Sequence, residues 1–278
     1  MFLQFMKKVY VVVIPTALII LIGLLLTRAA FETNRIGVIE VKGTISDAKE
    51  ITKNIKSFSE NKLIRAIILR VDSPGGGVAP SQEIFEAVKK ARERKKIIVS
   101  MGALAASGGY YISVPADLIV ANPGTITGSI GVLMEFVNLE KLMGKVGVGI
   151  QTIKSREHKD IGSPFRTMTE EERKLLQGVI TDVYQQFVEV VSTERNIPRD
   201  SVVKFADGRI FTGRQARDLG LVDTLGSFQD AVNILRDLVG IKTEPTLVYP
   251  KKKRSLKDLF FEPLDELLLP KIQYIFKM

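Results

Sequence analysis

Residues 63–77 read LIRAIILRVDSPGGG, and this stretch decides the fold. Leu63–Val71 is an apolar run rich in β-branched residues, which predicts a strand buried on both faces. Asp72–Gly77 ends that run, and Ser81–Lys95 follows with apolar residues at helical spacing. A buried strand, a glycine-rich turn and a helix in this order are typical of an α/β protein with a parallel sheet.

The same alternation continues on both sides of this stretch. Capping boxes at Thr169 with Glu172, and at Thr212 with Gln215, each predict the start of a helix. We therefore expect one α/β domain over residues 28–241, with a largely parallel sheet covered by helices. The pattern predicts further strands at 35–41, 96–100, 118–121, 149–154 and near 209–211, further helices at 46–59, 136–144, 169–196 and from 212, and loops at 122–131 and 155–166.

The amino terminus predicts a membrane anchor. Residues 9–27 contain no charge, and at about 1.5 Å per residue a helix of this length spans about 28 Å, close to the hydrocarbon core of a bilayer. Lys7 and Lys8 precede it, so the positive-inside rule places residues 1–8 in the cytoplasm and the domain outside. A cleaved signal peptide is the alternative, but this apolar run is longer than usual for one.

The charge balance agrees with a location at a membrane. The chain has 278 residues and a formal net charge of +9, which favours an anionic partner surface. Without an aromatic–basic RNA motif or a helix-turn-helix pattern, lipid headgroups fit better than nucleic acid. The basic and apolar tail, residues 242–278, has four interpretations: a membrane-surface segment, a subunit clamp, a peptide lying in a groove, or a partly ordered terminus.

Scarce residues restrict the possible chemistry. The chain has no Cys and a single His, His158, which excludes disulfides, a Cys nucleophile and His-rich or Cys-based metal centres. Ser107 lies within Gly102–Tyr111 (GALAASGGYY), where small neighbours would let a substrate carbonyl approach its hydroxyl. The same small residues would also suit close packing of a helix on a sheet. The glycine-rich turn at Asp72–Gly77 (DSPGGG) could bind an oxyanion through its N–H groups or could be a tight turn without a ligand.

A nucleophilic serine needs a base. Either His158 or a neutral lysine amine could accept its proton. Lys154 and Lys159 lie in the loop that follows a predicted strand, but residue chemistry alone does not select one of them.

Six motifs together resemble the signal peptide peptidase A family, whose members are membrane-bound Ser-Lys peptidases of the Clp protease/crotonase superfamily. That resemblance implies repeated β-β-α units in the fold. The motifs are DSPGG (72–76), AASGGYY (105–111), TGSIGV (127–132), KDIGSP (159–164), GR-x-x-TG (208–213) and LGLVD (219–223).

The resemblance also implies roles for individual residues. Ser107 looks like the nucleophile and Lys159 like the general base, with the N–H groups of Gly76 and Gly108 as the oxyanion hole. Ser129 is similar to the hydroxyl that orients the lysine. The carboxylate of the adjacent Asp160 would favour a charged amine, so we expect it to point away from the lysine.

The activity implied is endopeptidase cleavage of remnant signal peptides and other short apolar peptides, without metal, nucleotide or coenzyme. A ring-like homo-oligomer, an octamer for this chain length, is implied, with one subunit's lysine completing a neighbour's site. Three alternatives remain: an NfeD-associated membrane Ser-Lys protease acting on membrane-protein partners, a crotonase-like acyl-CoA enzyme, and a membrane scaffold that binds peptides without cutting them.

Overall fold

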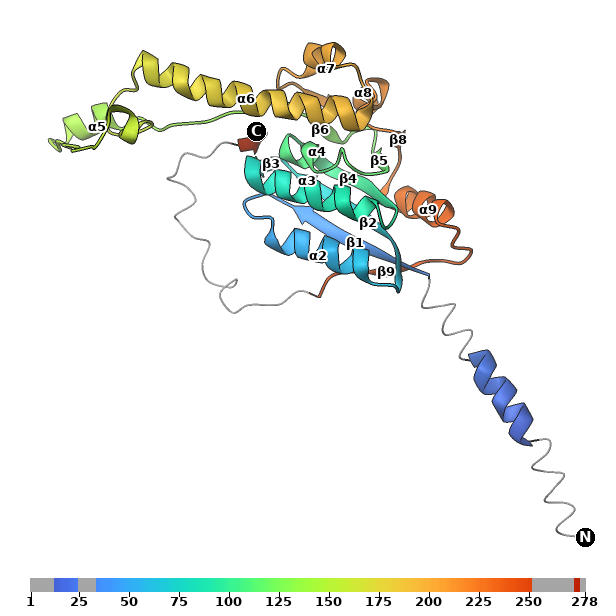
Figure 1. The fold of residues 1–278 in the computed structure, drawn as a ribbon. Coiled ribbons are helices and arrows are strands. Elements are labelled where there is room, and N and C mark those ends of the chain that lie inside the picture. Colours follow the sequence, from blue (N-terminus) through green and yellow to red (C-terminus); the bar gives the residue numbers. More distant parts are fainter. Residues whose placement is uncertain (1–12, 25–33, 252–272, 276–278) are drawn as a thin grey trace, which may run out of the picture.

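The computed structural model describes residues 13–24, 34–251 and 273–275 (Figure 1). Residues 13–24 form a helix, whereas positions 9–12 and 25–27 of the predicted anchor, and the predicted cytoplasmic residues 1–8, lie outside the described residues. Within the described part of the chain, no helix is both long and apolar enough to cross a membrane.

One sheet of eight strands organises the structure. Its strands follow the order β7-β6-β4-β2-β1-β9, while β5 pairs with β4 and β8 pairs with β5. Every pairing is parallel except that of β6 with β7, which confirms the predicted α/β class and largely parallel sheet. The bounds are β1 (Arg35–Lys42), β2 (Ile64–Ser73), β4 (Ile97–Ala106), β5 (Leu118–Ala121), β6 (Ile126–Gly128), β7 (Ile210–Thr212), β8 (Thr224–Leu225) and β9 (Thr246–Val248).

Helices cover both faces of this sheet. Alternation along β2 sends Ile67 and Leu69 into one buried cluster and Ile68 into the other. The larger cluster lies under α2, α3, α4 and α6, and the smaller one under α9. The helices are α2 (Lys49–Glu60), α3 (Val78–Arg92), α4 (Gly108–Tyr111), α5 (Glu140–Lys145), α6 (Glu170–Arg195), α7 (Arg199–Phe205), α8 (Gly213–Asp218) and α9 (Phe228–Leu238), with a 3-10 turn, η1, at Glu157–Asp160.

Local signals predicted the longest strands and helices except α9, whereas the helices α4, α7 and α9 and several short strands were not predicted. Both predicted capping boxes are present, at the starts of α6 and α8. The predicted turn after β2 contains a short strand, β3 (Gly75–Gly77), and the predicted loop at 122–131 contains β6. The strand predicted at 149–154 is wrong, because these residues have no regular structure and are exposed.

Two strands lie beyond residue 241. β9 pairs with β1, so the sheet uses residues that follow the predicted domain boundary. β10 (Gln273–Ile275) pairs antiparallel with β3.

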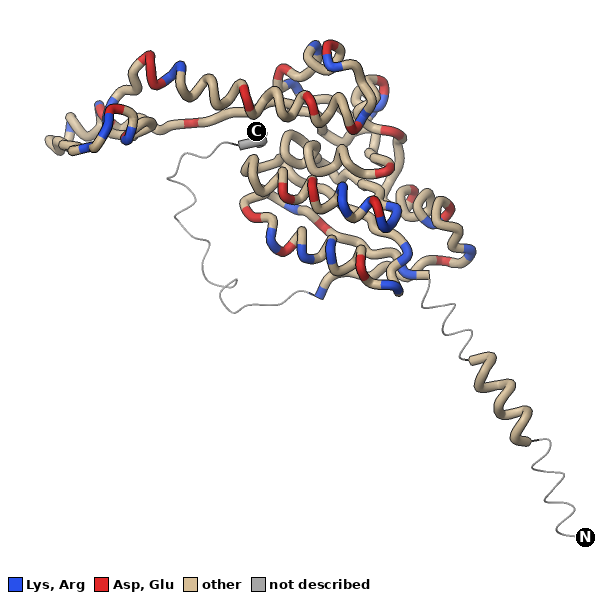
Figure 2. Tube along the Cα trace, viewed as in Figure 1, with Lys and Arg blue, Asp and Glu red and all other residues tan. Residues whose placement is uncertain are grey.

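An arm projects from the body of the molecule on the side of the carboxyl ends of the strands (Figure 1). It consists of residues 133–168, including α5 and η1, together with the first half of α6. Acidic and basic residues are interspersed along this arm and along α2 and α3 (Figure 2). The arm also exposes many large apolar side chains, namely Val137, Leu142, Val146, Val148, Ile150, Ile153, Phe165, Leu175 and Val179.

Candidate active site

Ser107 lies at the sharp turn between β4 and α4. Its φ of 54° and ψ of −117° fall outside the conformations that side chains favour. Its side chain is buried, and among the described residues its Oγ has no hydrogen-bond partner. Holding a non-glycine residue in such a conformation costs on the order of 1–3 kcal/mol, and such residues gather at functional sites.

The helix after Ser107 is firmly held. The Tyr110 hydroxyl donates to the carbonyl of Leu221 at 3.0 Å. The Tyr111 ring packs between Phe85 and Phe187, with centroid distances of 5.2 and 5.0 Å. Burial raises the pKa of Tyr111 to about 12, so this ring stays uncharged at physiological pH. The GGYY residues therefore fix the turn that presents the serine.

Ser129 lies beside Ser107. Ala106 pairs with Gly128 in the parallel register of β4 and β6, so the two serines follow neighbouring strands at matching positions. The N–H of Ser107 donates to the carbonyl of Gly128 at 2.8 Å. Apart from the helix C-cap Asn196, these two serines are the only non-glycine residues with positive φ in the described part of the chain. Sequence patterns gave no sign of this shared strain.

The DSPGGG segment meets the same turn. A Cβ at Gly109 would lie 2.7 Å from the Ser73 carbonyl oxygen, so the two glycine-rich motifs are in contact. A Cβ at Gly76 would lie 2.2 Å from the Ile45 carbonyl oxygen, so only glycine fits there. As the first residue of α4, Gly108 has an N–H without an intrahelical acceptor. The structure thus brings together four features at the carboxyl ends of the sheet strands: Ser107, Gly108, Ser129 and the β3 segment.

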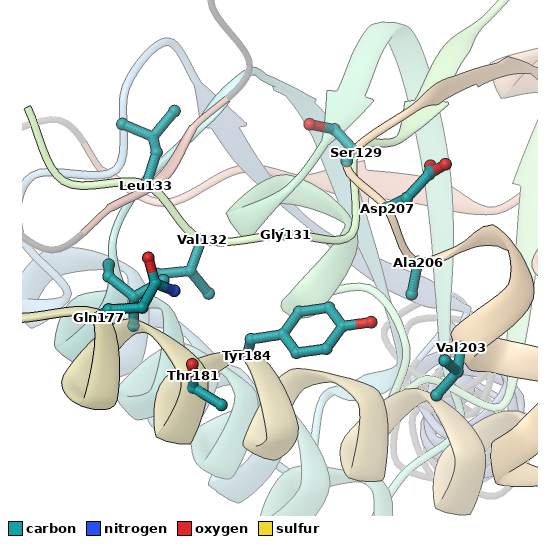
Figure 3. Close-up of a pocket in the computed structure, with 12 residues that line it drawn as sticks. Ser129, Gly131, Val132, Leu133, Gln177, Thr181, Tyr184, Val203, Ala206 and Asp207 are labelled. Carbon is teal, nitrogen blue, oxygen red and sulfur yellow. The ribbon is translucent and has the colours of Figure 1, made fainter. Parts of the chain in front are cut away.

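A cavity of about 630 Å³ adjoins this edge, with Ser129 at one end (Figure 3). Tyr184 of α6 points across it, and Val132 and Val203 line opposite sides. Its lining is thus partly apolar and partly hydroxylic.

Neither predicted base contacts Ser107 within the chain. Lys159 and His158 both belong to η1, in the arm, and Lys159 is exposed. Nε2 of His158 lies 3.9 Å from the Glu171 carboxylate. The described residues of one chain therefore bring together the nucleophile and oxyanion candidates but not the base.

Asp160 and Lys154 bind each other in the arm. Lys154 Nζ donates to Oδ1 of Asp160 at 2.7 Å and to the carbonyl of Glu157 at 2.8 Å, so this amine is not a free base. Hydrogen bonds from Arg166, and then from Lys154, hold the pKa of Asp160 well below its usual range. As predicted, the Asp160 carboxylate pairs with these residues and not with Lys159.

The pairing of β10 with β3 was missed, because a three-residue strand of glycines has no hydrophobic pattern. Tyr274 lies opposite Gly76 in this antiparallel pair. A segment from the predicted tail therefore lies along β3, the strand that contains the predicted oxyanion donor Gly76.

Comparison with known proteins identifies the family. The sequence profile of peptidase family S49 matches residues 89–242, and that of Clp protease matches residues 27–119. A putative protease of Synechocystis is 47% identical, covering 74% of this chain and 75% of the relative. A putative protease of Methanocaldococcus jannaschii is 37% identical, covering 73% of this chain and 65% of the relative. A putative signal peptide peptidase of Enterococcus faecium is 41% identical, covering 66% of this chain and about half (53%) of the relative. The chain belongs to peptidase family S49 and is a serine peptidase.

Proposed function

We propose that the chain is a membrane-bound endopeptidase with Ser107 as nucleophile and Lys159 as general base. The observation that carries this proposal is the Ser107 hydroxyl, which is buried, strained and without a partner in the described residues. Glycines directly after it leave space for a substrate carbonyl.

The proposed reaction is acyl transfer to the serine. The neutral amine of Lys159 accepts the Ser107 proton while Oγ attacks a peptide carbonyl. The N–H groups of Gly76 and Gly108 stabilise the resulting oxyanion, and Ser129 orients the amine. Protonated Lys159 then donates its proton to the leaving amine as the peptide bond breaks. Water, deprotonated by the same amine, attacks the acyl ester and releases the acid product.

We propose that Lys159 acts in the site of a neighbouring chain. It lies on an arm that exposes apolar residues such as Ile153, which would be stabilised by packing against a second copy. An arm of one chain on the body of the next is a head-to-tail contact, and such contacts form a ring when the rotation between neighbours closes. An incoming side chain could enter the cavity that Ser129 lines, and Ser129 follows Gly128, whose carbonyl accepts from the N–H of Ser107. The ring expected from the resemblance is an octamer.

The proposed substrates are extended apolar peptides at a membrane surface, including remnant signal peptides. The edge of β3 accepts an antiparallel strand, as its pairing with β10 illustrates, and a peptide bound this way would pass beside Gly76. One relative bears the name of a signal peptide peptidase. The uncharged segment 9–27 would anchor the chain as a single-pass protein with its catalytic domain outside the cytoplasm.

Three alanine variants test the dyad. Ser107→Ala and Lys159→Ala should each lower kcat for an apolar peptide by at least about 10³-fold. His158→Ala should retain most of the activity, and labelling by a serine-directed acylating probe should map to Ser107. Activity should rise into alkaline pH, since the base must be neutral. An active Lys159→Ala, an inactive His158→Ala or a flat profile from about pH 6 to 10 would contradict the proposed base.

A further inference from the structure

Arg166 joins the turn that carries Lys159 to the start of α6. Its Nε and Nη2 donate to Oδ2 and Oδ1 of Asp160 at 2.9 and 2.8 Å. Its Nη1 and Nη2 donate to Oε2 and Oε1 of Glu172 at 2.8 and 2.5 Å. One planar guanidinium thus forms two-pronged contacts with both carboxylates, a geometry that lysine cannot reproduce.

Arg166, Asp160, Glu172 and Lys154 form a charge cluster, and both of its carboxylates are shielded from solvent. The side chains of Glu172 and Asp160 are only 3% and 13% exposed. Glu172 also accepts from the N–H of Thr169 as part of the α6 capping box, which ties the cluster to a long helix. Hydrogen bonds from Arg166, and then from the Thr169 backbone, lower the pKa of Glu172 to about 2, so this carboxylate is ionised at physiological pH.

Charges within the cluster balance. Asp160 directly follows Lys159 in sequence, and an unpaired carboxylate there would favour the ammonium form of the lysine. Arg166 and Lys154 oppose Asp160 and Glu172, so two positive charges meet two negative charges. The other titratable or charged groups on η1, at its start and on the first turns of α6 are Arg156, Glu157, His158, Lys159, Glu170, Glu171, Arg173 and Lys174.

We infer that Arg166 is a positioning residue for the catalytic lysine: it fixes the turn that carries Lys159 and neutralises the adjacent carboxylate of Asp160. This inference rests on the proposed role of Lys159. No other contact of the described residues links Asp160 to α6 with comparable geometry, because Lys154 binds only within the loop.

Two substitutions separate the geometric and the electrostatic parts of this role. Arg166→Gln should lower kcat by about 10²-fold, the usual effect of misplacing a catalytic group by about 1 Å. It should also move the alkaline rise of activity to higher pH, because a net negative charge then remains beside the lysine. Arg166→Lys keeps the positive charge but loses the two-pronged contacts. It should therefore lower kcat less than Arg166→Gln does and leave the pH of the alkaline rise unchanged. Adding Asp160→Asn to Arg166→Gln removes this negative charge and should return the alkaline rise of activity toward its wild-type pH.

The matched control is Arg173→Gln. Arg173 lies at the same end of α6, and its one ion pair among the described residues is with Glu170, at 3.8 Å, so kcat and the pH profile should be unchanged. All rates are measured per site labelled by a serine-directed probe, on full-length variants whose oligomer size has been checked.

The outcomes are distinct. If Arg166→Gln keeps the wild-type rate per labelled site and the wild-type pH profile, the inference is wrong, even if fewer sites fold. If Lys159→Ala is itself active, the proposed function fails and this inference fails with it. An inactive Lys159→Ala with an unaffected Arg166→Gln overturns the inference alone.

Discussion

Ser107 and Ser129 show how the site is prepared at the scale of single residues. Each follows a strand of the sheet and has a positive φ, a conformation that is unfavourable for residues with a side chain. Close pairing of β4 with β6 and the packing of Tyr110 and Tyr111 impose these conformations. The stability of the surrounding core therefore offsets the local strain and holds the backbone of Ser107 in this conformation.

Gly76 offers a sharp test of the oxyanion site. A Cβ at this position would meet the Ile45 backbone, which cannot move without disturbing β3, so Gly76→Ala should displace the Gly76 N–H. We expect kcat to fall by about 10²-fold, comparable to the loss of one oxyanion donor. Gly124→Ala is the control, because its Cβ would meet nothing within 4 Å. Equal kcat values for the two variants, measured by peptide hydrolysis, would exclude Gly76 from the site.

At the scale of elements, β10 occupies the edge of β3 at which we propose that substrate binds. A tethered strand acts as a competitor at an effective concentration of about millimolar, so its removal should lower KM for an apolar peptide and leave kcat unchanged. A chain ending at Ile272 lacks β10, whereas one ending at Ile275 keeps it and serves as the matched control. Steady-state kinetics should give a several-fold lower KM for the shorter chain. If both chains have the same KM, β10 does not occupy the substrate edge.

The elements with the longest patterns were predictable, whereas α9 and several short elements were not. Leu63–Val71 is a long apolar run and 169–196 carries apolar residues at helical spacing, so β2 and α6 were expected close to their observed bounds. β3 and β6 are three-residue strands that contain glycine, and only their neighbours in space make them strands. The exposed segment 149–154 has strand-like composition but no adjacent strand in the described chain, so β propensity alone did not order it.

At the scale of the whole molecule, the projecting arm is the feature that the sequence did not predict. The motifs predict Ser107 and Lys159 as partners, yet the fold of one chain places them on different parts of the molecule. The sequence around Lys159 carries no periodic signal for a contact with a second chain. The proposal of such a contact rests on apolar side chains, such as Val146 and Ile153, that the structure exposes on a projecting segment.

Mixing two inactive variants tests whether the dyad forms between chains. Ser107→Ala keeps the lysine, and Lys159→Ala keeps the serine. If each site takes its serine from one chain and its lysine from the next, random co-assembly leaves about one site in four with both groups, as a head-to-tail contact requires. We therefore expect co-refolded variants to recover about a quarter of wild-type hydrolysis, while each variant refolded alone remains inactive. A mixture as inactive as its components, at the same oligomer size, would place both groups of the dyad in a single chain. The control mixes wild type in equal amounts with a chain that carries both substitutions. About one site in four should keep both groups if two chains share each site, whereas about half should keep them if each site lies within one chain.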